Sequence, residues 1–408
     1  MTGFTTKAIH TPFLKKDTHG SLRMPVYDTA AFEFETAEEI ESAFLGRKAS
    51  HTYSRITNPT VEHLEQQIKN VTNAFAVCAV ASGMAAISNL IISITGQGDN
   101  IITSKHIFGN TYSLFEKTLV PFGLEIRYAD FSDPITINKL IDKKTRAIFL
   151  ETITNPQLEV ADVKALSKIT REHKVLLIGD TTVTPLYLFK SRDFGVDIEV
   201  ISGTKYISGG ATTVGGVIID NGTYDWSYNP KLKADAKKYG QFTLVSKLKR
   251  EVCRNTGACL SPHNAYLQSL GMETLALRIE RSSANALYLA EFMSKHSKIL
   301  RVNYPGLLDS QFYTIALSQF NGYFGALLTF DLGSKEACFS FLNRLKLIRR
   351  ATNINDNKTL ALHPESTIFC EYSPELKSEM GISENMIRLS VGIEDKEDLA
   401  VDINQALS

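Results

Sequence analysis

Cysteine is scarce in this chain of 408 residues, and none of its five cysteines has CxxC spacing. Because their number is also odd, we expect neither a disulfide framework nor a four-thiolate zinc site, and a reducing compartment is the default. No apolar run is long enough to span a bilayer, and the first residues, MTGFTTKAIHTPFLKK, lack the apolar core of a secretory signal. The sequence therefore predicts a cytoplasmic protein that does not bind a membrane.

An excess of charge of either sign is also missing. The 44 basic and 44 acidic residues cancel to a formal net charge of +0. Dedicated nucleic-acid binders usually carry a basic excess, so nucleic acid is not an expected partner. The 43% hydrophobic and 22% charged residues are ordinary for a globular protein, which argues against disorder and fibrous structure.

Several familiar catalytic motifs are absent as well. The chain contains no HExxH, GxSxG, GxGxxG or GxxxxGK, and its nine histidines are scattered. No metal site and no Ser-His-Asp triad is therefore predicted. The glycine-rich stretch Ser208–Gly216 lacks the lysine and the helix of a phosphate loop, so we expect it to let backbone approach a sheet closely.

Short apolar runs alternate with helical patterns along the first part of the chain. Asn58 and Pro59 suit the N-cap and first position of a helix, and a strand at Phe75–Ala81 is followed by a helical pattern from Gly83. Buried strands alternating with helices predict a mostly parallel sheet covered on both faces, that is, an α/β fold. The further strand candidates are Asn100–Thr103, Leu124–Ala129, Arg146–Leu150, Lys174–Gly179, Asp197–Ser202 and Val214–Asp220.

The length predicts two or three domains, and the pattern changes after about residue 250. Residues 1–55 lack a clear amphipathic period and are interpreted as an N-terminal arm, followed by the α/β domain at residues 56–250. Residues 251–408 are predicted to form a smaller α+β domain. Its expected elements are a long helix from Leu260 to about His296 and strands near Tyr323–Phe330 and Met386–Val391.

Two charged residues lie at the ends of predicted strands. Asp180 closes the strand VLLIG, and Lys205 follows the strand IEVIS. Ligands of open α/β sheets gather at the carboxyl ends of strands, and a buried charge is costly unless it is paired or used. The two residues alone leave open whether they form a structural Lys–Asp pair or the two sides of a cofactor site.

A third element favours the cofactor site. The segment Ser82–Met84 lies where a strand turns into a helix, and glycine at a helix N-terminus offers free N–H groups to an anion. The hydroxyls of Ser202 and Thr204 supply further donors. A lysine for a Schiff base, an acid opposite a pyridine nitrogen and a phosphate cup are what pyridoxal 5′-phosphate requires. The acid keeps the ring nitrogen protonated, and partial burial lowers the pKa of the lysine.

Seven short motifs occur together in this chain: YSRITNPT (Tyr53–Thr60), ASGMAA (Ala81–Ala86), IFGNTY (Ile107–Tyr112), ETITNP (Glu151–Pro156), GDTT (Gly179–Thr182), SGTKYISGG (Ser202–Gly210) and IRLSVGIED (Ile387–Asp395). With them the chain resembles the Cys/Met-metabolism group of pyridoxal-phosphate enzymes. This group includes cystathionine lyases, methionine γ-lyases and O-acetylhomoserine sulfhydrylases. The resemblance covers nearly the whole chain and implies the type I fold of pyridoxal-phosphate-dependent transferases. It also implies a homotetramer built of two dimers with shared active sites.

The resemblance also implies roles for individual residues. Lys205 would form the Schiff base with the cofactor and shuttle protons between substrate carbons. Asp180 would pair with the pyridinium nitrogen, and Asn155 would contact the ring hydroxyl. Tyr53 and Arg55 would reach the phosphate of a neighbouring subunit, and Tyr53 is a second candidate catalytic residue.

Further expected contacts concern the substrate and the phosphate. Arg388 would clamp the substrate α-carboxylate with its planar two-donor group, and Ser366, within HPEST, would lie beside that carboxylate. Each assignment has a structural alternative: Arg388 as a surface residue, Tyr53 as a core aromatic and Asn155 as a turn former. The residues expected at the phosphate are Ser82, Gly83, Met84, Ser202 and Thr204.

One position departs from the family pattern. Phe108 stands where the family usually has a tyrosine. Its ring can still stack on the cofactor, but the hydroxyl thought to help proton transfer as the leaving group departs is missing. A carboxylate leaves readily because its acid has a pKa of roughly 4, whereas a thiolate comes from a thiol near roughly 8.5. The departure favours an O-acylhomoserine substrate, although Tyr53 or Lys205 could act instead.

Two segments, Tyr224–Lys231 and Leu260–Arg281, also resemble the sulfhydrylase branch more than the lyases. The predicted function is γ-replacement on O-acetyl-L-homoserine with a sulfur nucleophile, giving L-homocysteine and acetate in methionine biosynthesis. The alternatives are a cystathionine or methionine γ-lyase and, from another class, a non-catalytic binding protein. The sequence leaves the ester, acetyl or succinyl, and the sulfur donor open: free sulfide, methanethiol or the thiocarboxylate of a sulfur-carrier protein.

Overall fold

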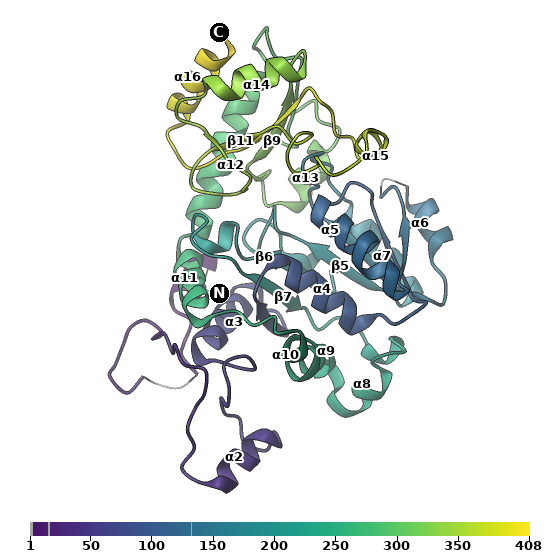
Figure 1. Ribbon diagram of the computed structural model, residues 1–408, viewed down its shortest axis with the longest axis vertical. Coiled ribbons are helices and arrows are strands. Elements are labelled where there is room, and N and C mark those ends of the chain that lie inside the picture. The colour runs from purple at the N-terminus through teal and green to yellow at the C-terminus, as the bar shows by residue number, and fades with distance from the viewer. Residues whose placement is uncertain (1–2, 15–16, 132) are drawn as a thin grey trace.

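The N-terminal residues form an arm that leaves the body of the molecule and returns to it (Figure 1). The computed structural model describes residues 3–14, 17–131 and 133–408. Helix α2 (Ala37–Phe44) lies at the far end of the arm and is capped by the side chain of Thr36. Helix α1 (Phe4–Ile9) packs against α3 (Pro59–Thr72), which begins after the N-cap Asn58 as predicted.

Within the described residues, seven strands form the sheet of the large domain, in the order β1-β7-β6-β5-β4-β2-β3. The sheet is mostly parallel, as predicted, but β7 runs antiparallel to both of its neighbours. A parallel return would need a crossover of a dozen or more residues, usually helical, and the link between β6 and β7 holds no α-helix. The strands are β1 (Ala76–Val80), β2 (Asn100–Thr103), β3 (Glu125–Tyr128), β4 (Thr145–Glu151), β5 (Leu176–Asp180), β6 (Ile198–Ser202) and β7 (Gly216–Asp220).

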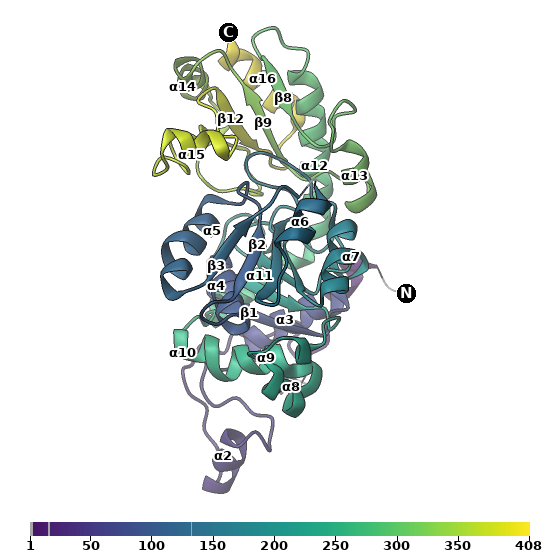
Figure 2. The same cartoon turned by 90° about the vertical axis from the view of Figure 1, so that its right-hand side faces the viewer.

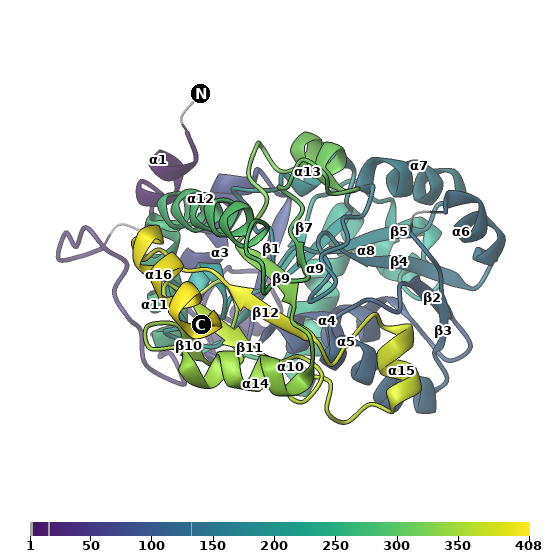
Figure 3. The same cartoon turned by 90° about the horizontal axis from the view of Figure 1, so that it is seen from above.

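Helices cover both faces of this sheet (Figure 3). In β4, Ile148 and Leu150 join the hydrophobic cluster that includes residues of α3 and α7, whereas Ala147 and Phe149 join the cluster that includes α4. Burial on both faces explains why the strands are nearly continuous apolar runs in the sequence. The helices are α4 (Gly83–Ile94), α5 (Gly109–Ser113), α6 (Pro134–Leu140), α7 (Val163–His173), α8 (Lys233–Tyr239), α9 (Thr243–Lys247) and α10 (Cys253–Thr256).

A second sheet, of five strands within the described residues, lies in the C-terminal part in the order β10-β11-β12-β9-β8. The long helix expected from Leu260 to about His296 is wrong in one respect: it is two helices, because Thr274 leaves helical geometry at ψ 7°. The elements are α11 (Pro262–Glu273), α12 (Leu275–Met293), β8 (Arg301–Asn303), α13 (Tyr313–Gln319), β9 (Leu327–Asp331), α14 (Lys335–Arg344), β10 (Arg349–Arg350), β11 (Leu360–Leu362), α15 (Pro374–Glu379), β12 (Met386–Ser390) and α16 (Lys396–Leu407).

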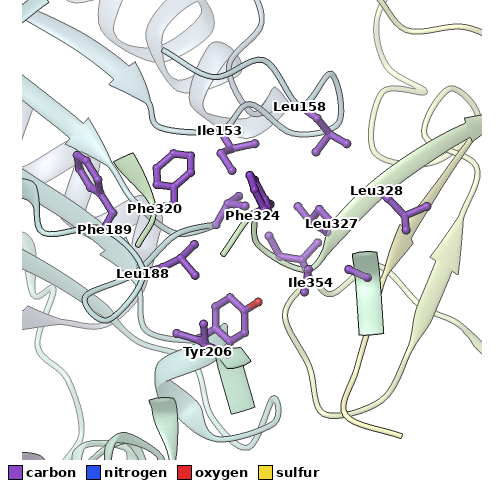
Figure 4. Packing of buried hydrophobic residues seen from close by; sticks show 14 of the residues in the cluster. Ile153, Leu158, Leu188, Phe189, Tyr206, Phe320, Phe324, Leu327, Leu328 and Ile354 are labelled. Carbon is purple, nitrogen blue, oxygen red and sulfur yellow. The ribbon is translucent and has the colours of Figure 1, made fainter. Parts of the chain in front are cut away.

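One hydrophobic cluster runs without interruption from the large domain into the C-terminal domain (Figure 4). Ile153 and Leu188 of the large domain and Phe324 and Leu327 of the C-terminal part are all buried in it. Because both domains share this core, residues of both can line one site between them. The domain boundary near residue 250 stays a prediction. Among the described helices, none combines the length and the hydropathy that crossing a bilayer would need.

Candidate active site

A cavity of about 430 Å³ lies at the carboxyl ends of β4, β5 and β6, where they meet the first turn of α4 and the C-terminal domain. Its volume is in the range of ligand pockets, and its place is the one expected for an open α/β sheet. Residues predicted from the sequence line most of it. They are Ser82, Gly83, Met84, Phe108, Asn155, Asp180, Ser202, Thr204, Lys205 and Arg388.

Asp180 and Lys205 line this cavity without bonding to each other. The Nζ of Lys205 donates to Oδ1 of Asn353 at 2.6 Å, and Oδ1 of Asp180 accepts from the Thr182 N–H at 2.9 Å. Burial raises the pKa of Asp180, whereas burial and the nearby Arg388 charge lower the pKa of Lys205 to about 8. The alternative of a structural Lys–Asp pair is therefore wrong, because the bonds given for these two side chains go to neutral groups.

Arg388, on β12, is a buried cation open to an anionic ligand. Only 2% of it is exposed, so the surface alternative is wrong. Its Nη1 donates to Oδ1 of Asn155 at 3.2 Å, its Nη2 donates to the carbonyls of Thr352 and Asn353, and its Nε has no partner. Burial lowers its pKa to about 10. A buried charge that meets only neutral groups suits a substrate carboxylate.

The first turn of α4 forms an anion cradle. Ser82 is the N-cap, and its hydroxyl accepts from the Ala85 N–H at 3.0 Å, which leaves the first N–H groups of the helix free of intrahelical partners. At Gly83 a Cβ would lie 2.7 Å from Cβ of Ser202, so glycine is needed for α4 to approach β6. The close approach predicted for the glycine-rich stretch is confirmed at Gly216, where a Cβ would overlap the Ser82 carbonyl.

Tyr53 and Arg55 lie outside this cavity. Tyr53 is 42% exposed, so the core alternative is wrong, and the Arg55 guanidinium lies 5.5 Å from the centre of its ring. Arg55 also donates to the Arg254 carbonyl at 2.6 Å and lines a separate cavity of about 40 Å³. Their contact with the phosphate of a neighbouring subunit stays a prediction.

Ser366 is likewise not among the residues that line the cavity. Its hydroxyl bonds to Nδ1 of His363 at 2.8 Å, while Nε2 of the same ring faces the Glu384 carbonyl at 2.7 Å. Because a carbonyl can only accept, Nε2 donates to it, and in a neutral ring Nδ1 then accepts from Ser366. The hydroxyl is thus engaged by His363, and its proposed place beside the substrate stays a prediction. Ile368, two residues further on, does line the cavity.

Glu151 and Asn353 are polar residues of the site to which the sequence did not point: Glu151 lines the cavity, and Asn353 is bonded to Lys205 there. Glu151 ends β4, opposite Asp180 in the strand register, and the argument that singled out Asp180 at a strand end also applies to it. Asn353, the partner of Lys205, lies in the irregular loop between β10 and β11, where no periodicity marks it.

His106 joins the two domains near Phe108. Its Nδ1 lies 2.9 Å from the carboxylate of Glu159, and its Nε2 lies 3.0 Å from the Glu379 carbonyl at the end of α15. Lys105 adds an ion pair of 2.6 Å to the Glu379 carboxylate. Figure 2 shows α15 beside α5 of the large domain. The Glu159 hydrogen bond raises the pKa of His106.

The residues of the cavity fit pyridoxal 5′-phosphate. Lys205 has a lowered pKa, Asp180 is a partly buried acid whose carboxylate forms no ion pair within the described residues, and the cradle at Gly83 is shaped by the absence of a side chain. In the ranges that the structure describes, no group of three or more His, Cys, Asp and Glu side chains is arranged to hold a metal ion. Fold and cavity thus define a pyridoxal-phosphate-dependent enzyme of the type I fold.

Comparison with known proteins gives the particular family. Residues 5–408 match the family model described as Cys/Met metabolism PLP-dependent enzyme, and the chain belongs to this family. Its cofactor is pyridoxal 5′-phosphate. A candidate O-acetylhomoserine (thiol)-lyase of Campylobacter jejuni, solved with pyridoxyl-lysine-5′-monophosphate, is 34% identical with a TM-score of 0.93, each chain being covered to 100%.

Two further relatives differ from each other in activity. A structure of the O-acetylhomoserine sulfhydrylase of the methionine biosynthetic pathway of Wolinella succinogenes is 46% identical, with a TM-score of 0.81 and 100% of each chain covered. The L-methionine gamma-lyase of Pseudomonas putida is 35% identical over 407 residues, which are 99% of this chain and 97% of that protein. These relatives show the family of this chain, but their different activities do not decide which reaction of the family it catalyses.

Proposed function

We propose that the protein catalyses γ-replacement on O-acetyl-L-homoserine, in which a sulfur nucleophile replaces acetate and L-homocysteine forms. The composition of the cavity carries this proposal. Phe108 lines it, and no tyrosine, histidine or cysteine is among the described residues that do. Acetate can leave without a proton, because its acid has a pKa of roughly 4, whereas a thiolate from a thiol near roughly 8.5 needs an acid. The cavity of one chain therefore suits an ester better than a thioether.

The side chains would divide the work as follows. When bound, pyridoxal 5′-phosphate supplies an electrophilic carbon and a ring that accepts electrons. Arg388 would bind the substrate α-carboxylate through its two-donor face. Lys205, with a pKa of about 8, can take a proton from the α-carbon and move it to neighbouring carbons near neutral pH. Asp180 would hold its negative charge against the ring nitrogen.

Apolar side chains make up much of the remaining wall. Ile87, Ile153, Val183, Ile354 and Ile368 line the cavity from both domains. They would keep water from competing with the sulfur nucleophile at the γ-carbon.

The second candidate is a γ-lyase, which the 35% identity to the L-methionine gamma-lyase of Pseudomonas putida supports. Product analysis separates the two. The protein is incubated with acetylhomoserine, succinylhomoserine, cystathionine and methionine, each with and without sulfide. Homocysteine from acetylhomoserine only when sulfide is present supports the replacement. Ammonia and a keto acid released from cystathionine or methionine without added thiol would instead identify a lyase.

We further propose that the protein works in the cytoplasm, in methionine biosynthesis, as a homotetramer of two dimers. Tyr53 and Arg55 would complete the cavity of the neighbouring copy in each dimer. The exposed Tyr53 and the arm that leaves the body support this arrangement (Figure 1). In the product analysis, acetylhomoserine is tested separately with each of three sulfur donors: sulfide, methanethiol and the thiocarboxylate of a carrier protein.

A further inference from the structure

Backbone contacts of two proposed cofactor-binding residues converge on one carboxyl group. The N–H of Phe108 donates to Oε1 of Glu151 at 2.6 Å. The backbone N–H of Asn155 also faces this carboxyl and stabilises its charged form. Asp180 lies opposite Glu151 in the register of β4 and β5. Glu151 is only 7% exposed and lines the cavity.

The contact with Phe108 fixes the backbone directly before a helix that has no side-chain cap. Phe108 is the N-cap of α5, a position that usually holds Ser, Thr, Asp or Asn because their side chains accept from the first turn. A phenylalanine cannot do so, and α5 begins without a side-chain cap. Glu151 reaches this point from another element and fixes the backbone there. The aromatic ring can then occupy the cavity although its residue starts the helix poorly.

We propose that Glu151 is a positioning residue for the cofactor: by holding the backbone at Phe108 and Asn155, it sets where the ring-stacking and ring-edge contacts lie. The proposal rests on the cofactor contacts proposed for these two residues. It does not depend on which substrate the enzyme uses.

Glu151 would hold this backbone as a neutral acid. Burial and the adjacent Asp180 raise its pKa well above the usual range. A protonated carboxyl still accepts through its carbonyl oxygen. An amide of the same shape keeps that acceptor, whereas a thioether of similar size does not. Glu151→Gln and Glu151→Met therefore differ mainly in the hydrogen bond that the proposal requires.

The experiment measures cofactor binding in the absence of substrate. Apo forms of the wild type, E151Q and E151M are titrated with pyridoxal 5′-phosphate, and the dissociation constant and the visible circular dichroism of the bound cofactor are recorded. The matched control is Asp220→Asn, which neutralises a buried carboxyl at the opposite end of the same sheet. A buried donor left without its acceptor costs enough to weaken binding on the order of tenfold.

We expect E151M to bind the cofactor on the order of tenfold more weakly and with an altered visible signal, and E151Q to stay within about threefold of wild type. D220N should match wild type in both readouts. Wild-type affinity and signal in folded E151M, or an equal loss in D220N, would overturn the proposal. If E151M does not fold, Glu151→Asp carries the test: its shorter carboxyl should weaken binding, and wild-type behaviour would refute the role. Failure of acetylhomoserine turnover would leave these measurements unaffected.

Discussion

The amine of Lys205 donates a hydrogen bond of 2.6 Å to the side-chain oxygen of Asn353, which comes from the other domain. The Nδ2 of Asn353 donates to Asp356 at 3.3 Å, and its carbonyl accepts from Arg388. One loop thus orients the two basic groups of the cavity. An acceptor beside an ammonium stabilises the charged form, whereas burial and the Arg388 charge lower the pKa of Lys205 to about 8.

Asn353→Ala should lower the pKa of Lys205 further, by about one unit, because the ammonium loses its neutral acceptor while the buried Arg388 charge remains. The pH dependence of covalent labelling of Lys205 in the apo protein measures this shift. Asn138→Ala, on the surface of the large domain, serves as the control. An unchanged labelling profile in N353A would show that the hydrogen bond does not influence the amine.

Lys205→Ala should abolish turnover and remove the visible absorbance of the Schiff base between this lysine and the cofactor, since no other lysine is present among the described lining residues. Absorbance spectra and steady-state assays of the purified variant check both effects. Lys117→Ala, a surface substitution, should keep them. Wild-type turnover in K205A would disprove the assignment of this lysine.

Gly83→Ala should weaken cofactor binding, because the added Cβ would lie 2.7 Å from Cβ of Ser202 and push α4 away from β6. Overpacking of this kind costs about 1–3 kcal/mol, which corresponds to a tenfold loss or more at the upper end. Titration of the apo protein with pyridoxal 5′-phosphate gives the value. Gly96→Ala is the control, because its nearest neighbour would be 3.7 Å away. Equal affinities of the two variants for pyridoxal 5′-phosphate would contradict the proposal that the first turn of α4 binds the cofactor's phosphate.

Arg388→Lys should raise KM for acetylhomoserine on the order of tenfold or more and leave the cofactor spectrum in place, because lysine is a point charge without the two-donor face. Steady-state kinetics and absorbance separate the effects. An unchanged KM would show that Arg388 does not bind the substrate carboxylate.

His106 should make stability depend on pH. Its two acceptors, the Glu159 carboxylate and the Glu379 carbonyl, can both be served only by the doubly protonated ring, and the Glu159 bond raises its pKa. The negative charge of Asp130 also raises the pKa of His106. Lys105, the residue before His106, is paired with the Glu379 carboxylate.

The pKa of His106 is higher in the folded protein than in the unfolded chain. The protonated ring therefore adds fully to the free energy of unfolding below the unfolded pKa of about 6.5, and this contribution is lost as the pH rises through the folded pKa. His106→Gln should therefore cost about 1 kcal/mol near pH 5.5 and less at pH 8.5. Denaturant unfolding at both pH values measures this difference. A cost that is equal at the two values would exclude a role for the charge.

The sequence predicted the parts of the molecule that local patterns specify. Periodicity and caps placed α3, α4 and the strands of the large sheet, and charges at strand ends found Asp180 and Lys205, whereas the short strands β8, β10 and β11 were not predicted. The reversal of β7 was missed because its direction depends on the link before it, and the break at Thr274 because the apolar pattern continues through it. Asn353 was missed because only tertiary packing brings its loop to the cavity.

The uninterrupted core shown in Figure 4 also has a consequence for how the enzyme unfolds. Phe324 and Leu327 are buried in the same cluster as Ile153 and Leu188. A fragment cut between the two sheets would therefore expose apolar side chains to water and would aggregate. Heat should likewise melt both halves together, and the cavity would vanish in the same event rather than through a gradual opening.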